Sequence, residues 1–214
     1  VCQGENIVFL VTADNATSYK FFDENGSEIG TSNSLSVNTT ALEPKTYSYK
    51  IQALNNYGCN SELFDFSFTV YDVPNTPTVT GDTVYCNGTE VNLTASSNGS
   101  TLIRWYSDPL FNNPITTNIS GTIGEVLSFT STEIGVVNYY IVAENSNNCT
   151  SATQEITVTI NPQVGDVTVN NDGVSFCQND TVELIARTTN TDDSFLWFTD
   201  EAGTTPASGI TGSN

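Results

Sequence analysis

The residues best able to do chemistry in this sequence are five cysteines. They are Cys2, Cys59, Cys86, Cys149 and Cys177. Cysteine thiols bind metal ions, take part in redox reactions or form disulfides. The sequence contains no histidine and no Cys-x-x-Cys pair, which argues against a zinc site and against a thioredoxin-type redox centre. Disulfide formation is therefore the favoured chemistry.

The spacing of the cysteines repeats. We call Cys2, Cys86 and Cys177 the early cysteines; they are separated by 84 and then 91 residues. A late cysteine follows each of the first two, Cys59 after 57 residues and Cys149 after 63. This register predicts two disulfides within modules, Cys2–Cys59 and Cys86–Cys149, each stabilising its own module by about 2–4 kcal/mol. Cys177 is left unpaired, and we expect its partner beyond residue 214. Two structural disulfides indicate an oxidising or extracellular location.

Charge excludes several classes of function. The chain has 24 acidic and 5 basic residues, giving a formal net charge of −19. So few cations cannot neutralise a run of phosphates, which argues against nucleic-acid binding. Without histidine there is no imidazole base, and the carboxylates lie in polar stretches rather than in an apolar pocket that would shift a pKa. We expect no enzymatic activity and no catalytic, cofactor-binding or metal-ligating residues.

Three landmarks recur between the cysteines. An apolar strand follows each early cysteine, an aromatic strand comes 19 or 20 residues after it, and a Tyr-rich strand leads into each late cysteine. Alternation of apolar and polar residues with many Val, Ile and Thr predicts half-buried antiparallel strands. The fold class expected is all-β, with tandem immunoglobulin-like β-sandwich repeats of which the third is incomplete. One aromatic residue of each repeat is expected in its core: Phe21, Trp105 and Trp197.

Prolines mark the expected boundaries. The predicted repeats cover residues 1–73, 74–162 and 163–214, the first without its N-terminal strand and the third only in part. Prolines in short connections restrict φ and favour extended backbone. The array is therefore expected to form a rod, and each repeat has its neighbours in the chain as partners.

These landmarks together resemble the immunoglobulin-like repeats of very large Bacteroidetes cell-surface proteins. The resemblance rests on Trp105-Tyr106-Ser107-Asp108, on the strand from Tyr139 to Asn145, on Asn148-Cys149-Thr150-Ser151 and on the closing strand 157–160. Such repeats occur in gliding-motility and other adhesins exported by the type 9 secretion system. The resemblance implies an extracellular, structural or adhesive shaft segment whose partners include surface polysaccharide or export machinery, with no membrane insertion.

Particular residues suggest other functions. The alternative is an accessory or carbohydrate-binding region of a secreted polysaccharide-degrading enzyme, for which the exposed aromatics would be Tyr57, Tyr85 and Phe111. Calcium could bind at acidic turns, although no EF-hand-type series is present. Those turns contain Asp108, Asp172-Gly173 and Asp192-Asp193. Asp82-Thr83-Val84 and Asp180-Thr181-Val182 resemble Bacteroidetes O-glycosylation sites, which would place glycans on Thr83 and Thr181.

Overall fold

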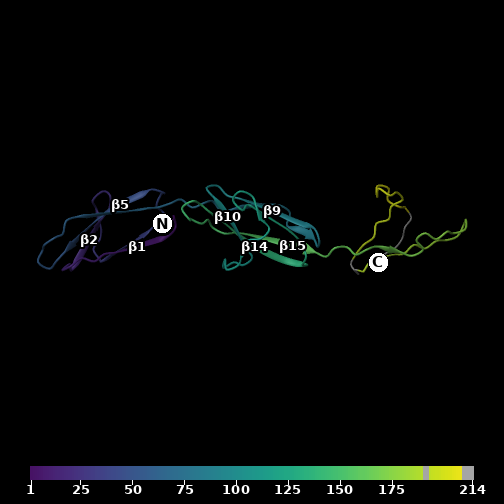
Figure 1. Ribbon diagram of the computed structural model, residues 1–214, viewed down its shortest axis with the longest axis horizontal. Coiled ribbons are helices and arrows are strands. Elements are labelled where there is room, and N and C mark those ends of the chain that lie inside the picture. Colours follow the sequence, from purple (N-terminus) through teal and green to yellow (C-terminus); the bar gives the residue numbers. More distant parts are fainter. Residues whose placement is uncertain (190–192, 209–214) are drawn as a thin grey trace.

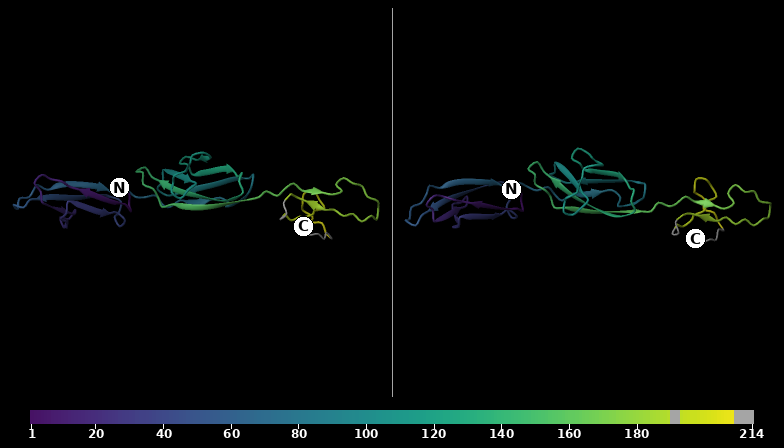
Figure 2. Two further views of the ribbon diagram at one scale, coloured as in Figure 1. Left: turned by 90° about the horizontal axis from the view of Figure 1, so that it is seen from below. Right: turned by 60° about the horizontal axis from the view of Figure 1, so that its bottom comes forward.

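The structure is a computed structural model that describes residues 1–189 and 193–208. Figure 1 shows its parts following one another along a single line, and the two views in Figure 2 preserve that arrangement. We call strands β1–β6 the first module, β7–β15 the second module and β16–β17 the third part. No helix in the described part of the chain is long and apolar enough to span a membrane. The chain is all-β, as predicted.

The first module has two antiparallel sheets. One pairs β1 with β4, and the other has the order β3-β2-β5-β6. Phe21 is fully buried between them, in contact with the cluster that contains Tyr19, Leu35 and Ile51. The strand bounds are β1 Asn6–Leu10, β2 Ser18–Phe22, β3 Glu28–Gly30, β4 Ser34–Asn38, β5 Thr46–Leu54 and β6 Phe64–Thr69.

The second module is larger. A five-stranded sheet in the order β11-β10-β14-β15-β8 faces a four-stranded sheet in the order β12-β13-β9-β7. In β9, Val91, Leu93 and Ala95 are buried while the residues between them are exposed, the alternation expected where one face of a sheet covers a core. The strand bounds are β7 Thr78–Thr80, β8 Val84–Cys86, β9 Glu90–Ser96, β10 Leu102–Tyr106, β11 Pro114–Ile115, β12 Ile119–Ser120, β13 Val126–Thr130, β14 Gly135–Glu144 and β15 Gln154–Asn161.

The core aromatics divide into two groups. Phe21 and Trp105 are buried as predicted, with 0% and 1% of their surface exposed, and the Trp105 indole N–H donates to the Gly124 carbonyl at 3.0 Å. The prediction for Trp197 is wrong, because its side chain is only half-buried. In the described residues of the third part, the only named strands are β16 (Thr168–Val169) and β17 (Ala186–Arg187), so no second sheet covers Trp197 there.

Pairing in the second module defines two poles. The β14–β15 ladder runs from Gly135 opposite Ile160 to Ile141 opposite Gln154. The end that contains the close of β15 is the C-terminal pole, from which the chain continues into the third part. The opposite end, where β7 begins, is the N-terminal pole. The first module is oriented in the same way, and its C-terminal pole adjoins the second module (Figure 1).

Truncation of the central tryptophan tests this account of the core. We expect Trp105→Ala to lower the free energy of unfolding of the second module by about 3–5 kcal/mol, because it removes a fully buried ring and leaves a cavity. Trp197→Ala is the matched control and should have a clearly smaller effect, since that ring is only partly buried. Denaturant unfolding followed by circular dichroism measures both. Equal losses for the two variants would contradict the burial described here.

Candidate functional site

The early cysteines begin turns of one kind. In each turn the amide three residues later donates to the cysteine carbonyl: Glu5 to Cys2 at 3.2 Å, Thr89 to Cys86 at 3.1 Å and Asp180 to Cys177 at 3.1 Å. The residue before that donor has a left-handed backbone: Gly4 (φ 95°), Gly88 (φ 85°) and Asn179 (φ 75°). Glycine and asparagine tolerate this conformation best. The three turns are thus the same local structure repeated.

A buried hydroxyl fixes the turn in each of the first two modules. Thr39 Oγ1 donates to the carbonyls of Cys2 and Glu5, at 3.0 and 2.8 Å. Ser131 Oγ contacts the carbonyls of Cys86 and Thr89 in the same way, at 2.9 and 3.1 Å. Both hydroxyl residues are almost completely buried. Since a buried polar group needs its partners, these contacts hold each early cysteine in a defined place.

The late cysteines also share one structure, a hairpin turn closed by asparagine. The Asn55 side chain accepts the Cys59 amide at 3.0 Å, and the Asn145 side chain accepts the Cys149 amide at 3.1 Å. In return, the backbone amides of the two asparagines donate to the carbonyls of Cys59 and Cys149, at 3.1 and 3.0 Å. Asparagine favours such turns because its short side chain bonds nearby backbone. Cys59 and Cys149 therefore stand at equivalent positions.

Early and late cysteines lie at opposite poles of a module. Cys86 pairs with Asn161 in the parallel β8–β15 ladder, at the C-terminal pole, whereas Cys149 follows the end of β14 at the N-terminal pole. Cys2 likewise forms a parallel bridge with Tyr71, and Cys59 follows the end of β5. A strand rises about 3.3 Å per residue, so some eight to ten residues of strand separate the two cysteines of a module by roughly 25–30 Å.

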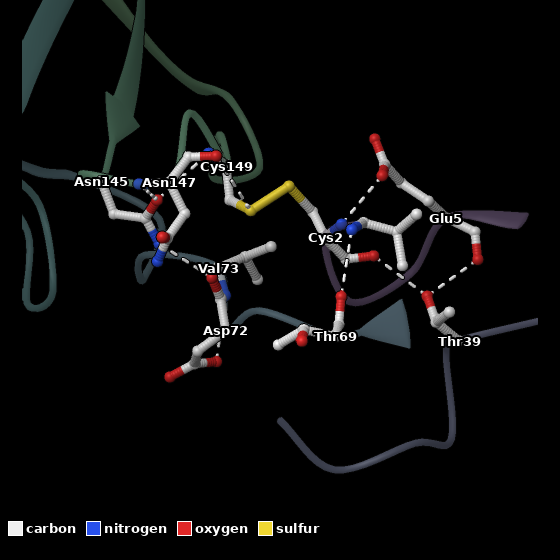
Figure 3. Close-up of a disulfide and its surroundings, with 10 residues drawn as sticks. Cys2, Glu5, Thr39, Thr69, Asp72, Val73, Asn145, Asn147 and Cys149 are labelled. Atoms are coloured by element: carbon white, nitrogen blue, oxygen red, sulfur yellow. Dashed lines mark hydrogen bonds between the residues drawn. A yellow bond between two sulfur atoms is a disulfide. The ribbon is translucent and has the colours of Figure 1, made fainter. Parts of the chain in front are cut away.

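The disulfide in the structure joins two modules. Cys2 bonds to Cys149, and their Cα atoms are 5.5 Å apart although 147 residues separate them in sequence. Figure 3 shows the bond running between the early turn of the first module and the late hairpin of the second. The predicted pairs Cys2–Cys59 and Cys86–Cys149 are wrong, and Cys59, Cys86 and Cys177 are free and exposed. The physical reason is distance, since disulfide Cα atoms lie at most about 7 Å apart.

The backbone joint between the modules lies beside this disulfide. Asn145 Nδ2 donates to the Asp72 carbonyl at 2.8 Å, so the asparagine that closes the late hairpin also holds the joint (Figure 3). The Asn75 amide donates to the Asn98 carbonyl at 3.1 Å. A shallow hollow between these segments is lined by Asp72, Val73, Pro74, Asn75, Asn98, Gly99 and Asn145. The disulfide thus connects the two modules directly, while hydrogen bonds from Asn145 to Asp72 and between Asn75 and residues 97 and 98 hold the joint against the second module.

An ion pair anchors the strand end next to the late hairpin. Arg104 Nε donates to Glu144 Oε2 at 2.8 Å across the β10–β14 pair. That hydrogen bond raises the pKa of Arg104 above its usual range, so the guanidinium stays charged. Glu144 is the last residue of β14 and directly precedes Asn145. The pair therefore restrains the base of the hairpin that presents Cys149.

The acidic residues that are candidate calcium ligands either accept hydrogen bonds from nearby groups or lie apart from one another. The Asp108 carboxylate accepts the amides of Leu110, Asn112 and Asn113. Asp193 Oδ2 accepts the Thr188 hydroxyl at 2.8 Å, Asp172 is exposed, and Asp192 lies outside the described residues. Within residues 1–189 and 193–208, no group of three or more His, Cys, Asp or Glu side chains is placed to hold a metal ion.

The remaining candidates are separated from one another. Thr83 and Thr181 are exposed and thus accessible to modification. Tyr57 is 91% exposed at the tip of the late hairpin of the first module, whereas Phe111 contacts Tyr106 edge-on at 5.0 Å. Tyr85 packs against the core of the second module. The three aromatics do not form a common face for sugar stacking.

Sequence reasoning overlooked the residues that hold the cysteines. Asn55 and Asn145 close the turns of the late cysteines, and the buried hydroxyls of Thr39 and Ser131 bind the turns of the early cysteines. A signal was present, because an asparagine stands four residues before each late cysteine and a glycine or asparagine two residues after each early one. The contacts of Thr39 and Ser131 gave no such signal, since they depend on segments 37 and 45 residues away from the cysteines.

Comparison with known proteins adds a family for the second module. Residues 74–162 match the family model described as "Ig-like domain CHU_C associated". They form an immunoglobulin-like module. No curated protein matches the chain. The predicted boundaries at residues 73/74 and 162/163 stay predictions.

Several solved structures are similar to this chain. The fibronectin(III)-like modules of Clostridium thermocellum CbhA have a TM-score of 0.44 at 12% identity, covering 75% of this chain and 88% of that one. Murine CEACAM1b has a TM-score of 0.37 at 14% identity, with coverages of 76% and 95%. A Bacteroides ovatus glucan-utilization protein, SGBP-B in complex with a mixed-linkage heptasaccharide, has a TM-score of 0.24 at 12% identity, with coverages of 84% and 48%.

The acidic loop after the tryptophan strand gives a pH prediction. Asp200 occupies the position of Asp108, and its carboxylate accepts the amides of Thr204 and Thr205. The Thr204 and Thr205 hydrogen bonds lower the pKa of Asp200 from 3.8 to about 2. A lowered folded pKa means that the carboxylate stabilises this loop above pH 3.8 and that its contribution is lost as the pH falls toward 2. NMR titration of the side-chain carbon should give a midpoint near 2, with Asp200→Asn as the assignment control; a midpoint near 3.8 would contradict the loop geometry.

Proposed function

We propose that residues 1–214 are a segment of the shaft of a large secreted cell-surface protein, in which covalently connected sandwiches transmit tension. The observation that supports it most directly is the Cys2–Cys149 disulfide, which joins two modules end to end rather than bracing one of them. A disulfide of this kind needs an oxidising environment, which supports an extracellular location.

The disulfide changes which part of the chain carries load. When tension is applied between the two ends of the chain, the shortest covalent path enters at Val1, crosses from Cys2 to Cys149 and continues along β15. Residues 3–148 lie outside this path. The strands from β1 to β14 are therefore shielded from tension, and neither sandwich needs mechanical strength of its own.

Thin cores and high negative charge agree with a structural role. The first module buries only four hydrophobic residues in its central cluster, so an additional restraint is useful. Four cations pair with carboxylates, and most of the acidic residues in the described part of the chain have no cation as a partner. Like charges along a rod oppose its collapse and its association with other rods.

The parent protein that we propose is an adhesin. The resemblance of the repeats to those of Bacteroidetes adhesins makes an adhesin shaft, including one used in gliding, the specific role proposed. The shaft would then project an adhesive region away from the cell. The proposal assigns no catalytic residue to this chain and assigns it no nucleic-acid partner.

Force spectroscopy on the chain held at its two ends tests the shaft proposal. Under oxidising conditions the fully stretched chain should be shorter by about 500 Å than after reduction, because the disulfide removes roughly 147 residues at about 3.5 Å each from the load path. The measurement is the contour length after all unfolding events.

Two cysteine variants serve as controls for that measurement. Cys149→Ser should give the long contour even under oxidising conditions, whereas Cys59→Ser should behave like the unaltered chain, since Cys59 is a free thiol. An oxidised chain that stretches to the full length of the reduced one would overturn the proposal.

A further inference from the structure

Cys86 occupies in the second module the position that bonded Cys2 occupies in the first. Both begin the same turn, and a buried hydroxyl binds the cysteine carbonyl in each case. The residue after each cysteine is held in the same way. The backbone amide of Gln3 donates to the Tyr71 carbonyl at 2.9 Å, and that of Asn87 donates to the Asn161 carbonyl at 2.8 Å. Cys86 is nevertheless exposed and free. Cys86 is therefore placed at the C-terminal pole of its module just as Cys2 is, but it forms no disulfide.

The joint that follows Cys86 also reproduces the joint beside Cys2. From Tyr71 to the start of β7 at Thr78 there are seven residues, and from Asn161 to the start of β16 at Thr168 there are again seven. The first strand of the third part pairs with β17 in a matching register, with Thr168 opposite Arg187 as Thr78 is opposite Ser96. A following module that is joined in this way places its late hairpin beside Cys86, just as the second module places Cys149 beside Cys2.

We propose that Cys86 is the early half of a second inter-module disulfide, whose partner is the late cysteine of a following module of the same kind. This inference rests on the proposed shaft function. By the same equivalence, Cys59 is a late cysteine that faces the early cysteine of a preceding module. Cys177 begins a third early turn, in which its amide donates to an Asp180 oxygen at 2.9 Å just as the Cys2 amide donates to Glu5.

The bond forms by thiol–disulfide exchange. The Cys86 thiolate attacks an oxidant in disulfide form, such as oxidised glutathione, which creates a mixed disulfide and releases one glutathione thiol. The thiolate of the partner cysteine then attacks the Cys86 sulfur, forms the protein disulfide and releases the second glutathione thiol. The two cysteines lose two protons and two electrons in total, and glutathione disulfide is reduced to two thiols.

Repeated along an array, these bonds connect the modules into a covalent ladder that lengthens only a little under tension. A bonded module is held at one pole by the joint near Pro74 and by Cys149, and at the other by Cys86 and Pro162. The shortest covalent connections between the poles are then Pro74 to Cys86 and Cys149 to Pro162, 12 and 13 residues. Fully stretched, each spans about 40–45 Å, against the roughly 25–30 Å that separate the two cysteines of a folded module, so unfolding of the strands between them releases only about 10–20 Å per module.

A chain with one additional module tests the proposal. Residues 163–214 contain Cys177 as their only cysteine, so the test supplies a late cysteine by inserting a second copy of residues 72–161 after Asn161. This insertion retains the full chain and the native joint sequence. The product has seven cysteines, and after oxidation with glutathione disulfide we expect two protein disulfides and three free thiols, counted by alkylation and intact mass.

Peptide mapping of the oxidised, unreduced product identifies the partners. The expected bonds are Cys2 to Cys149 of the first copy, and Cys86 of the first copy to Cys149 of the second. Replacing Cys86→Ser in the first copy should remove only the second bond and leave four free thiols. A product in which the Cys2 bond forms but the first-copy Cys86 stays free would overturn this inference while leaving the shaft proposal intact. Failure of the Cys2 bond itself would overturn both.

Discussion

Antiparallel pairing of β14 with β15 is the constraint on which the rest of the structure depends. The ladder places the end of β14 and the end of β15 at opposite poles of the sandwich. A late cysteine follows the first strand and an early cysteine is held against the end of the second through the parallel β8 pair. The two thiols of one module therefore cannot meet, and a disulfide in this architecture has to connect neighbouring modules.

The short joint between the modules keeps successive sandwiches in line, so that they form a rod. Short connections with proline restrict the backbone, and the late hairpin contacts the joint through Asn145. The bond from Cys2 to Cys149 then adds a second covalent connection beside the chain. Two connections at separate points oppose bending and twisting more than one does. The stiffness of the rod consequently depends on its joints, and the cores of the modules can remain small.

Much of the fold follows from the sequence. Alternation in segments such as 90–96 and the aromatic position of Trp105 predicted half-buried strands and a central core ring, and the structure confirms both. The prediction for Trp197 failed because burial requires a second sheet, which local pattern does not reveal. The identity of the site residues, the five cysteines, was likewise evident from residue type and spacing.

The cysteine pairing could not be obtained from spacing alone. Spacing placed one early and one late cysteine in each repeat, and the nearest partner in sequence was assumed to be the nearest in space. Which pole each cysteine occupies depends on the number and direction of the strands between them. In the second module an odd number of passes separates Cys86 from Cys149, so the chain ends at the opposite pole. The supporting contacts of Thr39 and Ser131 are long-range and lie beyond any local motif.

Tryptic mapping of the unreduced protein tests the inter-module disulfide most directly. Trypsin cleaves after Lys20, Lys45, Lys50, Arg104 and Arg187. It leaves Cys2 in peptide 1–20, Cys59 and Cys86 in peptide 51–104, and Cys149 and Cys177 in peptide 105–187. The account predicts that peptide 1–20 is linked to peptide 105–187 through Cys2 and Cys149, while Cys59, Cys86 and Cys177 are alkylated as free thiols. Linkage of peptide 1–20 to peptide 51–104, or a free Cys2, would contradict it.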